Sequence, residues 1–382
     1  MNVVLFVFGM GRSGSSALTR VLSLCGGALP AELVGATEGN PLGHWEPQDA
    51  LALNQAFLSQ HGSSWFDPTL RLQNEAGFTR EQKEAFIEGI KAFLGPLSAD
   101  PVLVIKEPRV TALSAFWFEA ARQVGRAIKI AIPVRHPAEV VASLASRDGA
   151  SPELASALWL KYNLLGERES RSYPRVFVEY TSLLSDWRAE LSRIAATLSV
   201  DLSLRDEASV DEFLRQDLRR QRHHGEIRDV FGMGWMSRVY GALSAAARGE
   251  PLETAALDEI FESYRGCEHA FRTAFADLQS RFTVDTHRNP RITTLIHATA
   301  GRDSQRLREC IDSSWYRAQN PDVLAAGCDP YEHWIAYGFT EGRLPCEDPL
   351  SLLDSLMREK ITRPITTISP GAASASVGSR SK

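Results

Sequence analysis

Short hydrophobic runs alternate with segments of helical spacing over the first 200 residues of the chain. The runs are rich in β-branched residues, too short to cross a membrane, and typical of strands buried on both faces. Between them, apolar positions recur at the three- and four-residue spacing of helices. Strands are therefore predicted at 3–8, 101–105, 127–134 and 175–180, and helices around 17–22 and at 48–60, 79–97, 112–124, 138–146, 151–171 and 183–198.

Strands that alternate with helices predict βαβ units and hence an α/β fold, a P-loop-like parallel sheet flanked by helices in three layers. From residue 211 onward no strand is expected, two helices fall within 239–279, and the C-terminal extension is helical. The predicted organisation is a P-loop-like domain (1–282), a polar linker (283–310), a small module (311–348) and a Ser-, Gly- and Ala-rich tail (349–382). The composition of the tail is typical of disorder.

Composition narrows the class of protein. The chain has 382 residues, 44% of them hydrophobic and 23% charged, and a net charge of -5, which gives no reason to expect a nucleic-acid partner. No apolar window is long enough for a membrane span, and no cationic segment precedes the first hydrophobic run. The five cysteines include no C-x-x-C pair. Reduced thiols and a cytoplasmic location are expected.

The loop after the first predicted strand reads Gly-Met-Gly-Arg-Ser-Gly-Ser-Ser over residues 9–16. A strand, a glycine-rich loop and a helix together point backbone N–H groups at an anion, so this loop is predicted to hold a phosphate. Gly9 and Gly14 have the spacing of a nucleotide P-loop, but Ser15 stands where the P-loop lysine should be. The cation lies inside the loop instead, at Arg12.

Cationic residues recur where the predicted strands end: Arg12, Lys106 with Arg109, and Arg135. In a parallel sheet these ends share one edge, so the cations are expected to converge on a ligand with several anionic groups. No later strand ends in the aspartate that a magnesium-dependent nucleotidase would need, so no metal is expected. Ser143 follows Arg135 by eight residues and could share a phosphate with it, or simply pack against the sheet.

Two residues of the loop after the first helix, His44 and Glu46, are candidate general bases. A carboxylate near Arg12 and Lys106 is expected to be ionised and able to accept a proton, and a histidine could do the same near neutral pH. Glu46 is the preferred base. The alternatives are that His44 is the base, or that Glu46 pairs with an arginine and His44 packs on Trp45.

These motifs together resemble the sulfotransferase family, in particular the bacterial branch related to tyrosylprotein and carbohydrate sulfotransferases, over about residues 1–280. The glycine loop resembles that family's 5′-phosphosulfate loop, and Pro-Val-Arg-His-Pro at 133–137 with Ser143 resembles its 3′-phosphate site. Lys-Glu-Pro-Arg at 106–109 is similar to a Lys-Asp-Pro-Arg segment of relatives, and residues 40–46 resemble the loop that carries the catalytic glutamate. The basic run at 219–224 resembles a late segment that closes on the nucleotide.

The resemblance implies transfer of a sulfuryl group from 3′-phosphoadenosine 5′-phosphosulfate (PAPS) to a hydroxyl, with PAP as the product and no metal. It implies that Glu46 takes the acceptor proton and that Arg12 and Lys106 stabilise the charge developing on the sulfuryl and bridging oxygens. The implied donor-binding residues are Arg12, Ser13, Gly14, Ser15, Ser16, Arg135, Ser143, Arg219 and Arg220.

The segment 315–345 resembles one that is often appended to bacterial glycosyltransferases, which favours a glycan or glycoconjugate as the hydroxyl-bearing acceptor. A module that docks, or one that only packs, is the other interpretation. Two further functions stay open for the chain: a P-loop kinase of a small molecule, and a non-catalytic nucleotide-binding or scaffold protein.

Overall fold

The chain forms two compact units, Met1–Thr273 and Ala274–Lys382, which are described separately. The sequence places the corresponding boundary at residue 282. In the computed structural model, the structure describes residues 2–36, 40–61, 63–73, 77–97, 100–148, 150–203, 206–214, 227–267, 308, 311–325 and 327–334.

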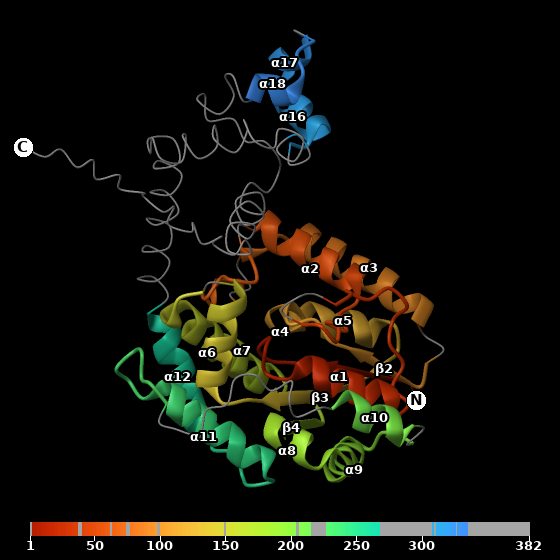
Figure 1. Ribbon diagram of the computed structural model, residues 1–382, viewed down its shortest axis with the longest axis vertical. Coiled ribbons are helices and arrows are strands. Elements are labelled where there is room, and N and C mark those ends of the chain that lie inside the picture. The colour runs from red at the N-terminus through yellow and green to blue at the C-terminus, as the bar shows by residue number, and fades with distance from the viewer. Residues whose placement is uncertain are drawn as a thin grey trace, which may run out of the picture. The chain divides into compact units, whose positions relative to one another are not determined.

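The described residues of the first unit form one four-stranded sheet of order β2-β1-β3-β4, in which every pairing is parallel (Figure 1). Val3 of β1 pairs with Val102 of β2 on one side and with Ala127 of β3 on the other, so the carboxyl ends of the central strands meet at one edge. This confirms the predicted α/β class. The strands are β1 (Val3–Val7), β2 (Val102–Ile105), β3 (Ala127–Val134) and β4 (Arg175–Glu179).

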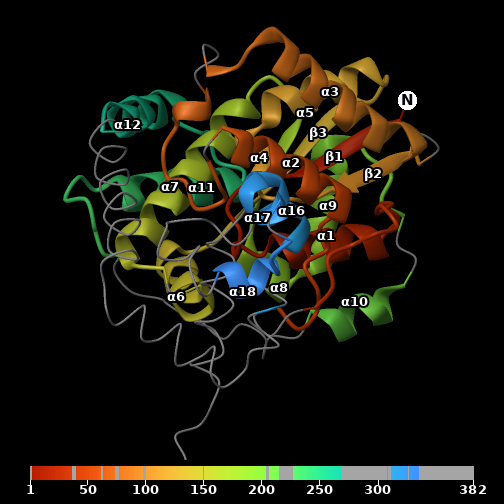
Figure 2. The same ribbon diagram turned by 90° about the horizontal axis from the view of Figure 1, so that it is seen from above.

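Alternating residues of β1 enter two different cores, which produces the three layers. Val4 and Phe6 face one hydrophobic cluster, whereas Val3, Leu5 and Val7 face the other. On the Phe6 side are α2 (Gln48–Gln60), α3 (Arg80–Leu94), α4 (Arg109–Ala112), α5 (Ser114–Gln123), α6 (Pro137–Asp148), α7 (Pro152–Glu169), α11 (Trp235–Ala247) and α12 (Thr254–Gly266). On the Leu5 side are α1 (Ser15–Leu24), α8 (Tyr180–Ser185), α9 (Trp187–Leu198) and α10 (Glu207–Phe213). In Figure 2, α3 and α5 lie on one side of β1 and β3, and α1 and α10 lie on the other.

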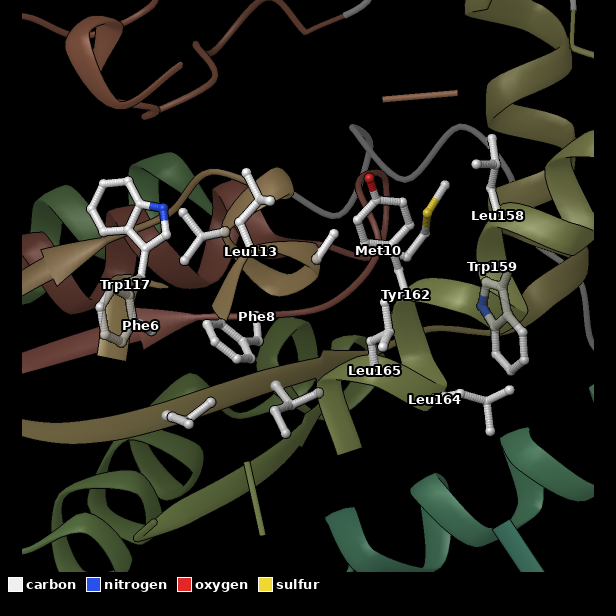
Figure 3. Packing of buried hydrophobic residues seen from close by; sticks show 14 of the residues in the cluster. Phe6, Phe8, Met10, Leu113, Trp117, Leu158, Trp159, Tyr162, Leu164 and Leu165 are labelled. Carbon is white, nitrogen blue, oxygen red and sulfur yellow. The ribbon is translucent and has the colours of Figure 1, made fainter. Parts of the chain in front are cut away.

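Aromatic rings fill much of the core on the Phe6 side. The rings of Phe6 and Trp117 meet edge to face, with centroids 6.2 Å apart, and the cluster continues to α7 (Figure 3). Met10 lies beside Tyr162 in this view, and both are buried. Met10, the second residue of the glycine loop at 9–16, therefore anchors that loop in the core.

Two predicted helices differ from the observed ones. The segment 112–124 corresponds to α5 and shares only Ala112 with the preceding α4, whereas 183–198 is split at Asp186 between α8 and α9. The Asp186 carboxylate accepts the backbone N–H of Ala189 at 3.0 Å and so caps a new helix. The predicted N-cap Thr79 is confirmed, with a reciprocal capping box to Gln82. The short α10 is an addition to the prediction, and η1 (Arg71–Gln73) and η3 (Gly95–Leu97) are single 3₁₀ turns.

The described part of the second unit consists of short helices around a small core. They are α16 (Ser313–Gln319), α17 (Pro321–Ala325) and α18 (Pro330–His333), in keeping with the predicted helical extension. Asp312 and Asp329 cap α16 and α18 with their side chains. The core residues are Ile311, Tyr316, Val323, Tyr331 and Trp334.

Candidate functional site

The glycine loop joins β1 to α1 and leaves the start of α1 open. The N-cap residue is Gly14, in a left-handed conformation with φ 88°, and it offers no side-chain cap. The N–H groups of the first helical turn have no partner within a helix, so they are available to an anion. The hydroxyl of Ser13 is buried and has no hydrogen-bond partner among the described residues. Both features suit a phosphate cradle.

Tyr180, the first residue of α8, closes one side of this loop. A Cβ added to Gly14 would lie 2.2 Å from Cδ2 of Tyr180, so only glycine allows the ring this close. The guanidinium of Arg135 lies 4.8 Å from the centre of the same ring. The ring therefore joins the phosphate loop to the cation that follows β3.

The structure brings Arg12, Arg135 and Ser143 together. Nε of Arg12 donates to Oγ of Ser143 at 2.9 Å, and Nη1 of Arg135 donates to the backbone carbonyl of Arg12 at 2.8 Å. Nε of Arg135 also pairs with the buried carboxylate of Glu139 at 2.7 Å, one turn into α6. Arg12 itself has a φ of 68°, a conformation that turns the loop at this residue and is uncommon outside glycine.

A further cation near this group, Arg147, was not identified from the sequence. It lies four residues after Ser143 on α6, and its Nε donates to both carboxylate oxygens of Asp148, at 2.9 and 2.8 Å. Burial, together with the charges of Arg147 and Arg135, lowers the pKa of Arg12 to about 10. In a sequence, adjacent Arg and Asp residues are typical of a solvent-exposed surface. The four-residue spacing from Ser143 is therefore the only signal that could have identified Arg147.

Lys106 and Glu46 form a second group, at the end of β2. Their side chains make a short ion pair and are only 4% and 12% exposed. Nζ of Lys106 also donates to the His44 carbonyl at 3.2 Å, and the Ser16 hydroxyl lies 3.4 Å away. Lys106, a candidate catalytic cation, thus contacts both Ser16, the last residue of the glycine loop, and the candidate base Glu46.

The environment sets the protonation of both candidate bases. Burial alone would raise the pKa of Glu46, but the charge and hydrogen bond of Lys106, with His44 and Arg109, lower it below its usual value. Burial lowers the pKa of His44. At pH 7 Glu46 is therefore a carboxylate and His44 a neutral imidazole. Lys106 forms its ion pair with the Glu46 carboxylate and contacts His44 through the backbone carbonyl.

Trp45, between the two candidates, holds this loop in an unusual shape. Its φ is 57°, in the left-handed region that a bulky residue seldom occupies. The indole lies against the guanidinium of Arg20, 4.4 Å from the ring centre, and meets Phe213 of α10 edge to face. These contacts bring the carbonyl of His44 and the carboxylate of Glu46 to the same lysine.

A buried polar network supports the segment after β2. Glu107 is completely buried and accepts from Nδ2 of Asn54 at 2.6 Å and from Nη1 of Arg109 at 2.5 Å. Nε1 of Trp117 completes the network by donating to the Asn54 amide oxygen at 2.9 Å. The sequence identified Glu107 and Arg109 but gave no signal for their partners on α2 and α5.

Arg219 and Arg220 lie outside the described residues, as does the remainder of the basic run. Within the described ranges, no group of three or more His, Cys, Asp or Glu side chains is arranged to hold a metal ion. No described helix is both long enough and apolar enough to cross a membrane.

The solved structures that resemble this chain include two sulfotransferase domains of low sequence identity. No protein-family model matches the chain, and no curated protein matches it. Among solved structures, the sulfotransferase domain from the Synechococcus PCC 7002 olefin synthase is 18% identical with a TM-score of 0.39, over 64% of this chain and 94% of that one. The sulfotransferase domain from the curacin biosynthetic pathway is 16% identical with a TM-score of 0.36, over 66% of this chain and 99% of that one. Similarities of this size do not identify a family.

Proposed function

We propose that this chain is a sulfotransferase that moves the sulfuryl group of PAPS to an acceptor hydroxyl. The observation that carries the proposal is the buried pair of Lys106 and Glu46 in contact with Ser16 of the phosphate loop. A cation and an ionised carboxylate beside a phosphate cradle are what in-line transfer to a hydroxyl requires, because one group stabilises the leaving oxygens and the other accepts a proton.

The contacts support a role for each group of the pair. Glu46 accepts the proton of the attacking hydroxyl, a new S–O bond forms, and the bond from sulfur to the bridging phosphate oxygen breaks. Lys106 stabilises the negative charge on that leaving oxygen. In the ligand-free pair, Lys106 makes Glu46 a weak base. Phosphate oxygens that draw the Lys106 ammonium away would raise the basicity of Glu46 when the donor is bound.

The site also suits the two ends of PAPS. The loop from Ser13 to Ser16, with its open helix start and buried Ser13 hydroxyl, offers donors to the 5′-phosphate. Arg135 and Ser143 both hydrogen-bond to Arg12, which supports a shared role in binding the 3′-phosphate. Arg219 and Arg220 are proposed to close on the same nucleotide. A P-loop kinase is the less favoured alternative, because Ser15 stands where that chemistry needs lysine.

The acceptor is proposed to be a hydroxyl of a carbohydrate or glycoconjugate. This part rests on the likeness of the C-terminal module to segments appended to bacterial glycosyltransferases. A panel of sugar, phenol and aliphatic alcohol acceptors with labelled PAPS would test it. Transfer to phenols or simple alcohols and none to sugars would reject a carbohydrate acceptor while leaving sulfuryl transfer in place.

Ligand-induced stabilisation tests the donor directly. Saturation with PAP at about 100 times its Kd should stabilise the folded chain by roughly 2.7 kcal/mol, which raises the thermal midpoint measurably. A shift with ATP plus Mg²⁺ and none with PAP would reject the sulfotransferase and favour the kinase. Stabilisation by none of the nucleotides would favour a scaffold.

Substitutions then test the chemistry. Glu46→Gln should lower kcat by about 10²- to 10⁴-fold, the usual contribution of a general base, while the chain still binds PAP. The matched control is Glu84→Gln on α3, which removes a carboxylate from the exposed pair with Arg80 and should leave kcat unchanged. Equal activity of Glu46→Gln and wild type would refute the role of Glu46.

A further inference from the structure

We propose that Arg12 recognises the 3′-phosphate of the donor, together with Arg147, and so selects a 3′-phosphorylated nucleotide. This rests on the proposed function and deepens it, because it moves Arg12 from the sulfuryl group to the discriminating end of the donor site. It also adds Arg147 to the binding residues. The sequence alone grouped Arg12 with Lys106.

The first step is the direction of the Arg12 side chain. The guanidinium hydrogen-bonds through Nε to Ser143 on α6, the residue expected to hold the 3′-phosphate. The backbone carbonyl of Arg12 accepts from Arg135, the other residue expected there. Both ends of Arg12 are thus tied to the 3′-phosphate pair, and the left-handed backbone of Arg12 is what turns the loop toward α6.

The second step is the position of Arg147. Residues four apart on a helix lie on the same face, so Arg147 and Ser143 lie one above the other on α6. Arg147 is held in place by its neighbour Asp148 and remains about a quarter exposed. A phosphate bound at Ser143 would therefore lie within reach of a second guanidinium from the same helix.

The third step is the charge balance. Three guanidinium groups, of Arg12, Arg135 and Arg147, face the two carboxylates of Glu139 and Asp148, which leaves these five residues with a positive excess. Burial lowers the pKa of Arg12 most, and the neighbouring charges of Arg147 and Arg135 lower it further. A phosphate dianion would relieve the repulsion between these cations and could accept several charge-assisted hydrogen bonds.

The fourth step is the contrast with Lys106. Its ammonium pairs with Glu46 and donates to the His44 carbonyl, so it belongs to the group that contains the base. The contacts of the two cations therefore assign different tasks to them. Lys106 serves the reacting centre, and Arg12 serves the recognition of the nucleotide.

The test compares PAP with 5′-AMP, which lacks only the 3′-phosphate. Arg12→Gly is the informative variant, because glycine adopts the left-handed backbone of residue 12 without strain, and the variant should fold normally. We expect it to reduce the preference for PAP over AMP by about tenfold or more, while AMP affinity changes little. Arg147→Met, at a position about a quarter exposed and outside the loop, should reduce the same preference less strongly.

Two further variants make the outcome specific. Arg12→Lys keeps a charge and should restore part of the preference, and Lys106→Met should lower kcat with the PAP-to-AMP ratio unchanged. An Arg12→Gly variant that keeps the wild-type ratio but loses kcat would overturn the inference and return Arg12 to the sulfuryl group. A wild-type chain that binds PAP no better than AMP would instead reject the proposed donor, and this inference with it.

Discussion

Replacing Gly14 by alanine would force a side chain into the space occupied by the Tyr180 ring. The added Cβ would lie 2.2 Å from Cδ2 of that ring, well inside van der Waals contact, and the backbone has a φ of 88°. Tyr180 would have to rotate away, and Arg135, 4.8 Å from the ring centre, would lose its contact. The added methyl group would therefore disturb both the glycine loop and Arg135, the cation that follows β3.

The magnitude follows from these two effects. A left-handed backbone costs a non-glycine residue about 1–2 kcal/mol. Loss of the contact between Arg135 and the ring adds about 0.5–2 kcal/mol. We therefore expect Gly14→Ala to lower the free energy of unfolding by about 1.5–4 kcal/mol and to weaken PAP binding, because Arg135 is no longer held by the ring.

Urea denaturation of Gly14→Ala, Tyr180→Ala and the double variant measures this coupling. Tyr180→Ala removes the ring that alanine at position 14 would strike, so the double variant should be more stable than the sum of the single losses predicts, by about 1 kcal/mol or more. When Tyr180 is already alanine, Gly14→Ala should cost only the free energy of the left-handed backbone. Losses that add within about 0.5 kcal/mol would refute the packing of Tyr180 on Gly14.

Three further outcomes are expected. Ser13→Ala should leave stability unchanged or raise it by up to about 1 kcal/mol, because it removes a buried hydroxyl that has no partner among the described residues. The same variant should bind PAP more weakly, as measured by calorimetry. A loss of stability with unchanged PAP binding would contradict this prediction. Glu107→Gln should cost about 3 kcal/mol in denaturation, because it leaves buried Arg109 without its counter-ion, and exposed Glu88→Gln is the control. The pKa of Glu46 is lowered, so kcat/KM should stay level from neutral pH down to about 4.5 and fall only below that. The stability from the ion pair should likewise be lost as pH falls through the folded pKa of Glu46. Because burial lowers the pKa of His44, an acid limb above about 4.5 but below the usual histidine value of about 6.5 would indicate a histidine base.

The sheet could be predicted from the sequence because its physical signal is local. Four apolar runs gave the strands to within a residue or two, and β3 matches its predicted bounds, 127–134. The edge that gathers Lys106 and Arg135 followed from parallel pairing alone. The helix break was missed because a cap competes with continued helix: Asp186 both ends α8 and caps α9. Such competition is settled by tertiary packing.

The site could be predicted only in part. Its residue types followed from the strand ends, but the way they pair depends on backbone turns and long-range contacts that no local pattern encodes. The partner of Arg12 is 131 residues away in the chain, and the partners of Glu107 come from two other elements. Arg147 was missed for a different reason, since an Arg-Asp dipeptide has no distinctive signal in a sequence.

Two bulky residues of the site, Arg12 and Trp45, have left-handed backbones, and the third non-glycine residue of this kind in the described chain, Ser199, ends α9. At Arg12 and Trp45 the left-handed backbone sets the direction of the groups on either side of it. At Arg12 the guanidinium turns to α6, while Ser16 continues to Lys106; at Trp45 the carbonyl of residue 44 and the carboxylate of residue 46 meet the same ammonium. Strain of about 1–3 kcal/mol at each position persists only where surrounding contacts impose it. Here those contacts are Ser143 and Arg135 for the first loop, and Arg20 and Phe213 for the second. If the proposed roles hold, substitutions at Arg12, Arg135 or Ser143 should act mainly on nucleotide binding, and those at Lys106 or Glu46 on kcat.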